Sequence, residues 1–241
     1  MINRSQYVVT VYIRSMYLSI IIPTLNEADY IEQTLSVLNE NLSGKNIHEV
    51  IIVDAGSTDS TLDKVKDKVD KLHVDECLRG AKFKSLNKGV ELAKGEMLLF
   101  LDADCHLPRH FDVLISEVLN SHEVVGGAFE FKMSGGGFIF RMVELVNRIR
   151  YRLDQRYFGD QGVFCQKTTF DQVGGYPLQP IMEAAYFCKL LTAKGKISLI
   201  KHPIVSSIRR FDQGNAIQVF AQDLWVWVQY VLGLDISKCV V

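Results

Sequence analysis

Short apolar runs alternate with amphipathic helical patterns along the first hundred residues of the chain. The apolar runs over 18–22, 50–53 and 97–101 predict strands that are buried on both faces. Between them, apolar residues recur at helical spacing after Asn26, which can cap a helix, and again over 83–93. Strands that alternate with helices predict an α/β fold with a mostly parallel sheet and right-handed crossovers.

The pattern is less regular in the second half. It predicts helices over 108–119 and from Phe138 onwards, and strands over 124–131 and 196–200. No repeat, low-complexity linker or abrupt change in composition divides the chain. We therefore expect a single domain over residues 17–232, preceded by an N-terminal extension over 1–16.

The last predicted helix, over 213–232, has more apolar surface than one packed face requires. One stripe, which we expect to pack on the domain, consists of Ile217, Phe220, Ala221, Leu224, Trp225, Val228 and Val231. Val226, Trp227 and Tyr230 fall outside this stripe. Either the helix lies between two elements of its own fold, or the additional apolar side contacts a membrane interface or a partner chain.

Composition and charge exclude several classes of protein. The 241 residues are 48% apolar and 23% charged, as in ordinary soluble domains, and the net charge of -1 gives no reason to expect a nucleic-acid partner. The five cysteines are scattered without a CxxC pair, which argues against disulfides and a zinc site and favours a reducing cytoplasm. No apolar run approaches the ~20 residues that a membrane span needs, and the first 16 residues do not resemble a signal peptide.

Two carboxylates, Asp102 and Asp104, directly follow the most apolar strand. Ligands of open α/β sheets bind at the carboxyl ends of strands, and paired carboxylates there are costly without a compensating cation. Such oxygen ligands suit Mg²⁺ or Mn²⁺, which in turn suit a substrate diphosphate. Taken alone, the pattern is equally compatible with an ordinary polar loop.

Other strand ends add polar groups to the same edge of the sheet. Thr24, Asn26 and Glu27 follow the first strand, and Asp54 follows the second. The glycine-rich dinucleotide fingerprint and the P-loop are both absent from the sequence. A nucleotide would therefore be held by side chains and a metal rather than by a glycine-rich loop.

These segments resemble the ordered motifs of family 2 glycosyltransferases, which have the GT-A nucleotide-sugar-binding fold. The resemblance rests on residues 19–27 (SIIIPTLNE), 53–61 (VDAGSTDST), 86–89 (LNKG) and 101–104 (LDAD). Three later segments, GDQG at 159–162, GGYP at 174–177 and SSIRR at 206–210, resemble a small single-domain bacterial branch of that family.

The resemblance implies an inverting transfer of a sugar from a nucleoside diphosphate donor, a UDP-sugar being the first expectation. Residues 17–104 would form the nucleotide-binding half and 105–232 the acceptor-binding half. The donor-binding positions would be Thr24, Asn26, Glu27, Asp54, Lys82, Asp102 and Arg209, with Arg79 competing with Lys82, and Arg210 beside Arg209 on the diphosphate. Asp102 and Asp104 would hold Mn²⁺ or Mg²⁺, and His202 is a weaker candidate ligand.

One departure from the family pattern concerns the general base. The family usually has a Glu-Asp pair at a helix start, whereas Glu183 is followed here by Ala184. Three interpretations stay open: Glu183 is the base, Asp160 is the base or orients the acceptor, or the protein binds a nucleotide sugar without efficient transfer. Loss of a general base typically costs ~10²–10⁴-fold in rate. Gln161 is a candidate for positioning an acceptor hydroxyl.

A non-catalytic nucleotide-sugar binder is the rival class, and a nucleotidyltransferase is disfavoured because no glycine-rich basic loop precedes the first helix. The acceptor would be a saccharide or a lipid-linked molecule. The arginines over 141–156 form either a solvated face or, together with the last helix, a site for anionic lipid or a lipid-phosphate acceptor. The last helix itself could make a peripheral contact with the inner face of a membrane or a homodimer contact.

Overall fold

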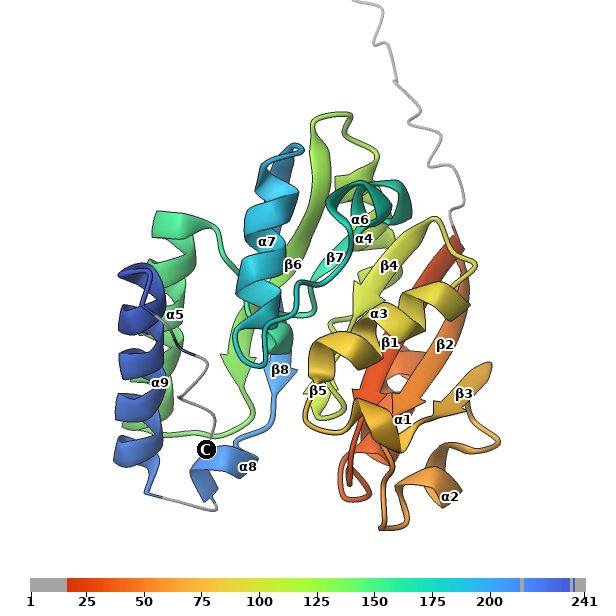
Figure 1. The fold of residues 1–241 in the computed structure, drawn as a ribbon, viewed down its shortest axis with the longest axis horizontal. Helices are drawn as coiled ribbons and strands as arrows, with labels where there is room; N and C mark the ends of the chain where they lie inside the picture. The colour runs from red at the N-terminus through yellow and green to blue at the C-terminus, as the bar shows by residue number, and fades with distance from the viewer. Residues whose placement is uncertain (1–16, 213–214, 235, 237–241) are drawn as a thin grey trace, which may run out of the picture.

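A computed structural model describes residues 17–212, 215–234 and 236, so the expected extension over 1–16 lies outside the described residues. The chain forms a mixed α/β structure around an eight-stranded sheet with the order β3-β2-β1-β4-β7-β6-β8-β5 (Figure 1). The strands are β1 (Tyr17–Thr24), β2 (Ile47–Asp54), β3 (Lys71–Val74), β4 (Met97–Phe100), β5 (Cys105–His106), β6 (Val124–Met133), β7 (Phe164–Gln166) and β8 (Lys196–Ser206).

The two halves of the sheet differ in strand direction. In the first half, β1 pairs in parallel with β2 and β4, and β2 pairs in parallel with β3. In the second half, β7 runs antiparallel to both β4 and β6, β6 and β8 are parallel, and β5 is antiparallel to β8. The expected α/β fold with a mostly parallel sheet is confirmed. The sequence pattern did not predict β3, β5 and β7, which are only two to four residues long.

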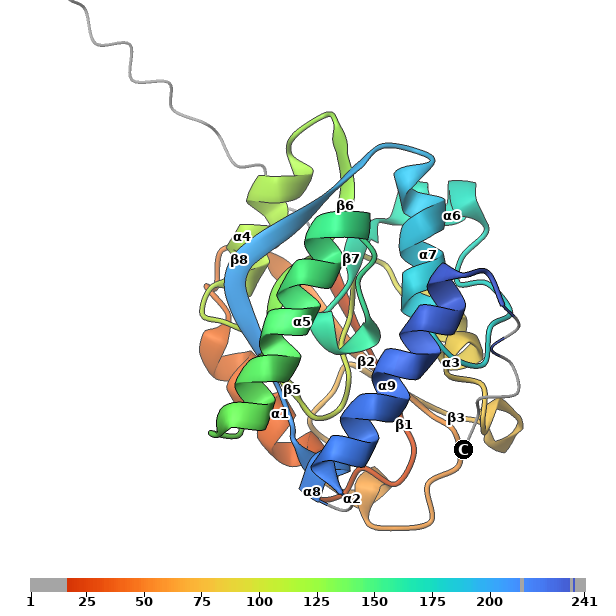
Figure 2. The same cartoon turned by 90° about the vertical axis from the view of Figure 1, so that its left-hand side faces the viewer.

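Helices cover both faces of the sheet and add a further layer beside its second half (Figures 1 and 2). They are α1 (Ile31–Asn41), α2 (Thr61–Val65), α3 (Lys82–Leu92), α4 (Phe111–Leu119), α5 (Phe138–Asp154), α6 (Lys167–Val173), α7 (Glu183–Thr192), α8 (Arg209–Asp212) and α9 (Ala216–Val231), with 3₁₀ turns η1 (Glu76–Leu78) and η2 (Gly159–Gln161). Within the described residues, none of these helices combines the length and the apolarity that crossing a bilayer requires.

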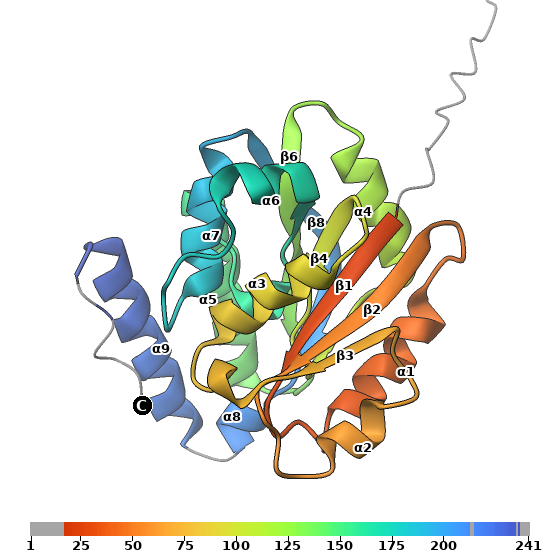
Figure 3. The ribbon, with the colours of Figure 1, turned by 45° about the vertical axis from the view of Figure 1, so that its right-hand side comes forward.

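The alternating side chains of β1 separate two hydrophobic cores. Ile20 and Ile22 pack with residues of α1 and α4 on one face of the sheet, whereas Ile21 packs with residues of α3 and α7 on the other (Figure 3). All three isoleucines are fully buried, and burial of each contributes about 1.5–3 kcal/mol. This packing fixes the direction in which the carboxyl ends of β1, β2 and β4 point.

The predicted cap of the first helix is wrong. Helix α1 begins at Ile31, and Asn26 lies four residues before its N-cap, in the left-handed region at φ 55°. The side-chain carbonyl of Asn26 accepts a hydrogen bond from the backbone N–H of Thr58 at 2.8 Å. The loop after β2 therefore uses the oxygen that was expected to cap the helix.

The predicted orientation of the last helix is also wrong. The stripe expected to pack on the domain is largely exposed in α9, with Ile217 at 69% and Trp225 at 63% exposure. Instead, Trp227 and Tyr230 face inwards, and the Tyr230 ring meets that of Tyr186 edge to face at 4.9 Å. The aromatic side of α9 is the one that finds partners on α7, so it determines how the helix packs.

Candidate active site

The ends of β1 and β2 are joined by a buried carboxylate. Thr24 and Asp54 are opposite each other in the parallel register, and Thr24 Oγ1 donates to Asp54 Oδ2 at 2.7 Å. The carboxylate of Asp54 also accepts hydrogen bonds from the backbone N–H groups of Gly56 and Ser57 and from the Ser57 hydroxyl. Asp54 is fully buried, so it shapes the loop after β2. The expected contact of Asp54 with a nucleoside stays a prediction.

Arg209 connects two of the predicted acidic residues. Its guanidinium donates to both carboxylate oxygens of Glu27, with Nη2 at 3.0 Å from Oε1, and its Nε lies 2.9 Å from Asp104 Oδ2. Arg209 begins α8, directly after β8, so a residue from the far end of the chain reaches the loop after β1. Burial raises the pKa of both Glu27 and Asp104; Arg209 opposes that rise, while Asp102 adds to it.

Lys82 connects two other predicted acidic residues, Asp102 and Glu183. Its ammonium Nζ lies 2.6 Å from Asp102 Oδ1 and 3.6 Å from Glu183 Oε1. Burial disfavours the charged ammonium, but the two carboxylates outweigh burial and raise the pKa of Lys82. Arg79, the alternative to Lys82, instead donates to the backbone carbonyl of Gly56. Lys82 at the start of α3 is thus the lysine that faces the end of β4.

Glu183 occupies the first position of α7, where the unpaired N–H groups of a helix favour a negative charge. Met182, just before it, has φ 59°, so the chain turns sharply into the helix and brings Glu183 towards Lys82. Ala184, at the position where the family usually has a second acid, is 2% exposed and belongs to the core on the α7 side of the sheet.

The GDQG segment contributes two side chains in different environments. Asp160 Oδ1 is buried and has no hydrogen-bond partner among the described residues. Burial and the nearby Asp102 carboxylate raise the pKa of Asp160 to about 7. Gln161 is fully buried; its amide oxygen accepts from Arg150 and from the N–H of Phe158, and its amide nitrogen donates to the Phe129 carbonyl. The acceptor role of Gln161 stays a prediction, and its contacts are those of a residue that supports the loop.

Negative charge exceeds positive charge in this cluster. Its acidic groups are those of Glu27, Asp102, Asp104, Asp160 and Glu183, whereas the cations that act on them are Lys82, Arg209 and, at Asp160, Arg150. This excess of negative charge opposes the approach of a diphosphate, and an additional cation would reduce the repulsion.

Asp102 and Asp104 fit one kind of metal site. Within the described residues, no three acidic, histidine or cysteine side chains are placed to hold a metal ion by themselves. Mg²⁺ is commonly held by one or two carboxylates together with substrate phosphates, so the two aspartates fit a site that the donor completes. His202 is an exposed residue of β8 and is not among the residues that line the pocket.

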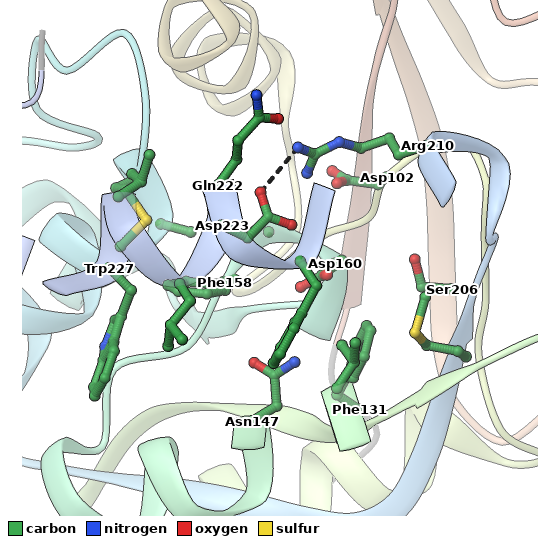
Figure 4. A pocket seen from close by; sticks show the side chains of 18 of the residues that line it. Asp102, Phe131, Asn147, Phe158, Asp160, Ser206, Arg210, Gln222, Asp223 and Trp227 are labelled. Carbon is green, nitrogen blue, oxygen red and sulfur yellow. Dashed lines mark hydrogen bonds and ion pairs between the residues drawn. The ribbon is translucent and has the colours of Figure 1, made fainter. Parts of the chain in front are cut away.

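A pocket of about 730 Å³ extends from these charged groups (Figure 4). At one end it is lined by Lys82, Asp102, Asp104 and Glu183. Its other walls come from β6, α5, α8, α9 and the residue before η2, and they are mainly apolar, with Phe131, Met133, Val143, Phe158, Phe211 and Trp227. The polar side chains of Asn147, Arg210, Gln222 and Asp223 also line it. The indole Nε1 of Trp227 is buried and has no partner among the described residues. The pocket thus combines a charged end with a mainly apolar chamber.

Sequence reasoning missed the role of the LNKG and GGYP segments. The amide of Asn87 accepts from the N–H of Tyr176 at 2.9 Å and donates to its carbonyl at 3.0 Å. The Tyr176 ring stacks on Phe187 with centroids 4.2 Å apart and meets Phe100 edge to face at 4.9 Å. Phe100 ends β4, so this cluster holds the strand that presents Asp102. The sequence showed that both segments are present, but it did not show that they contact each other.

The role of Gly159 was also not predicted from the sequence. A Cβ atom there would lie 2.8 Å from Lys82 Nζ and 3.4 Å from Asp102 Oδ2. The missing side chain leaves room for the ammonium against the carboxylate. Glycine within GDQG was visible in the sequence, but its contact with Lys82 required the fold.

Comparisons with known proteins identify relatives. The model of the family described as glycosyl transferase family 2 matches residues 19–171. The glycosyltransferase AglE of Haloferax volcanii is 31% identical over 129 residues, which are 50% of this chain and 42% of AglE. A dolichol-phosphate mannosyltransferase of Pyrococcus furiosus is 32% identical over 118 residues, or 47% of this chain and 33% of that protein. The chain thus spans less than half the length of these two curated relatives.

A solved structure has a similar fold. The mannosyltransferase PcManGT from Pyrobaculum calidifontis, in complex with GDP-Man and Mn²⁺, superposes with a TM-score of 0.61 at 22% sequence identity. The match covers 80% of this chain and 57% of that one. It supports the GT-A fold that the sequence motifs implied.

Proposed function

The chain belongs to glycosyl transferase family 2, and on that basis we propose that it transfers a sugar, with inversion, from a nucleoside diphosphate donor to an acceptor hydroxyl. The observation that carries this proposal is the convergence of the family's acidic motifs on one pocket, where Asp102 and Asp104 lie beside Lys82 and Arg209. The donor is assigned to residues 17–104 and the acceptor to 105–232. A UDP-sugar is the first donor to test.

In the proposed reaction, the acceptor oxygen bonds to the anomeric carbon while the bond between that carbon and the diphosphate oxygen breaks. Glu183, or Asp160 in its place, takes the proton of the acceptor hydroxyl. Lys82 and Arg209 orient the diphosphate and balance part of its charge. A divalent cation on Asp102 and Asp104, Mn²⁺ or Mg²⁺, would neutralise the leaving diphosphate.

The apolar chamber supports an acceptor with an apolar body. Phe131, Met133 and Val143 line the pocket beyond the carboxylates, and a plain saccharide would leave these side chains poorly matched. A lipid-linked acceptor would place its hydroxyl or phosphate at the charged end and its apolar part against these residues.

A thermal-shift screen of UDP-, GDP- and dTDP-sugars with Mn²⁺ tests the donor. A donor present at 100 times its Kd should stabilise the protein by about 2.7 kcal/mol, which corresponds to a shift of several degrees. The shift should disappear in Asp104→Ala and persist in the matched variant Asp67→Ala, whose carboxylate is exposed and distant from the pocket. The proposal fails if no nucleotide sugar stabilises the wild-type protein.

A further inference from the structure

Helices α5 and α9 lie next to each other in front of the second half of the sheet (Figure 2). Val143 of α5 packs against Phe131 and Met133 of β6, and Tyr230 of α9 is buried beside Ala185 of α7. The opposite sides of both helices therefore face away from the domain. We define these two sides together as the outer face.

The outer side of α5 alternates apolar and basic residues. Phe138 is 81% exposed, Ile149 is 50% exposed and Leu145 is 46% exposed. Exposed arginines lie between them. At about 100° per residue, all of these positions fall within an arc of about 100° of the helix: Phe138, Arg141, Leu145, Arg148, Ile149 and Arg152. This composition is typical of helices that lie in the plane of a membrane interface.

The outer side of α9 continues the apolar surface. Its exposed large apolar side chains are Ile217, Leu224, Trp225 and Val231, and Leu232 follows directly after the helix. Of these, Leu224 and Trp225 also border the pocket, so the apolar surface continues from its rim. Isolated exposed apolar residues need no explanation, but a group of this size on two neighbouring helices marks an interaction surface.

The charge of the outer face indicates the partner. Among the described side chains of α5, the single carboxylate is that of Glu144, and it accepts a hydrogen bond from the N–H of Met133 on the inner side. Arg148 pairs with Glu130 of β6, while no carboxylate is within ion-pair distance of Arg141 or Arg152 among the described residues. Asp223 of α9 already pairs with Arg210. The outer face is therefore apolar and positively charged.

We propose that the outer face docks the protein on an anionic lipid bilayer. The apolar side chains of α5 and α9 would enter the headgroup region, with Trp225 at the interface, and the arginines would face the lipid phosphates. A second copy of the chain fits less well, because a two-fold contact through this face would bring its arginines against one another. This inference goes beyond the proposed transferase activity and does not depend on it.

The two tryptophans of the chain, Trp225 and Trp227, provide the test. Trp227→Phe leaves Trp225 on the outer face as the only indole, whereas Trp225→Phe leaves the inward-facing Trp227. Vesicles of phosphatidylcholine with about 30% phosphatidylglycerol, carrying bromine on the acyl chains, should quench Trp225 more strongly than Trp227. Pure phosphatidylcholine vesicles should quench neither residue appreciably, and added salt should weaken the effect.

Two charge-matched double variants complete the experiment with the full-length protein. Arg141→Gln with Arg152→Gln should weaken binding to the anionic vesicles about 30-fold, at about 1 kcal/mol per arginine. Lys66→Gln with Arg109→Gln removes the same charge from exposed positions elsewhere and should leave binding within about twofold. Equal losses in both variants, equal binding to neutral vesicles, or a dimer in sedimentation that shields Trp225 from an aqueous quencher would each overturn the proposal.

Discussion

The ammonium of Lys82 lies 2.6 Å from a carboxylate oxygen of Asp102 and 3.6 Å from a carboxylate oxygen of Glu183. One lysine thus connects the aspartate proposed to hold the metal with the residue proposed to act as base. A bound diphosphate would compete with Asp102 for this ammonium. The contact therefore couples donor binding to the freedom of the metal-binding carboxylate.

Replacement of Lys82 should impair both binding and chemistry. Lys82→Gln removes the positive charge next to Asp102, so we expect the donor-induced thermal shift to decrease and kcat/KM to fall by about 10²–10³-fold. Lys84→Gln, two residues along in α3 and exposed, should behave like the wild type. Unchanged kcat/KM in Lys82→Gln would contradict the assigned role.

A methyl group at Gly159 should displace the same ammonium. In Gly159→Ala the new Cβ would lie 2.8 Å from Lys82 Nζ, which is the far end of a flexible side chain. We expect the fold to persist with a loss of stability below about 1 kcal/mol, while donor affinity falls. Gly136→Ala is the control, because no atom lies within 4 Å of a Cβ there. Thermal unfolding and donor titration measure the two effects separately, and an unchanged donor affinity would argue against the prediction.

Glu183→Gln tests the general base. The amide keeps the size of the side chain but cannot take a proton, so kcat should fall by ~10²–10⁴-fold while the donor-induced thermal shift remains. Asp160→Asn is the paired measurement. A full loss in Asp160→Asn with little loss in Glu183→Gln would move the role to Asp160, and donor binding without diphosphate release in the wild type would favour the non-catalytic alternative.

Asp160 should make stability depend on pH in metal-free buffer. Its pKa rises from 3.8 to about 7 on folding, so the folded state holds the proton more tightly than the unfolded chain. The resulting stabilisation is fully present below about pH 3.8 and is lost as the pH rises through about 7. Relative to Asp160→Asn, the wild type should lose about 2–4 kcal/mol between pH 4 and pH 8. Denaturant unfolding at several pH values measures this difference, and a constant difference would refute it.

The close approach of α3 to β1 requires glycine at position 89. A Cβ in Gly89→Ala would lie 2.3 Å from Cγ2 of the fully buried Ile21, so we expect a loss of about 1–3 kcal/mol. In a double-mutant cycle, Gly89→Ala should therefore cost less stability in the Ile21→Ala background than in the wild type. Additive losses in urea unfolding would show that the contact with Ile21 is not the cause.

Hydrophobic periodicity predicted the core strands and helices well, because the apolar positions along their sequence are the ones that the fold buries. The run that forms β4 has no exposed residue, so its sequence fits only an interior strand. Periodicity did not predict the packing of α9, because apolar residues occur on several sides of that helix. Which side is covered depends on partners such as Tyr186, 44 residues away from Tyr230 in sequence.

In the candidate site, too, some features could be predicted from the sequence and others could not. Asp102, Asp104 and Asp54 could be placed at one edge of the sheet because the ends of parallel strands meet there. The ion pairs of Lys82 and Arg209 could not be predicted, since they depend on the exact path of α3 and on the turn after β8. The role of Gly159 could not be predicted either, because it depends on how closely Lys82 and Asp102 approach its Cα.

The pairing of Arg209 with Glu27 spans 182 positions of the chain. During synthesis, the ribosome must add 182 residues after Glu27 before Glu27 and Asp104 obtain this counter-charge. Until then, the nascent chain carries a mutually repelling acidic group at the tips of strands that can already pair. The arrival of α8 would therefore complete the charge balance of the site, and a protein truncated before Arg209 should retain its sheet but not a closed binding pocket.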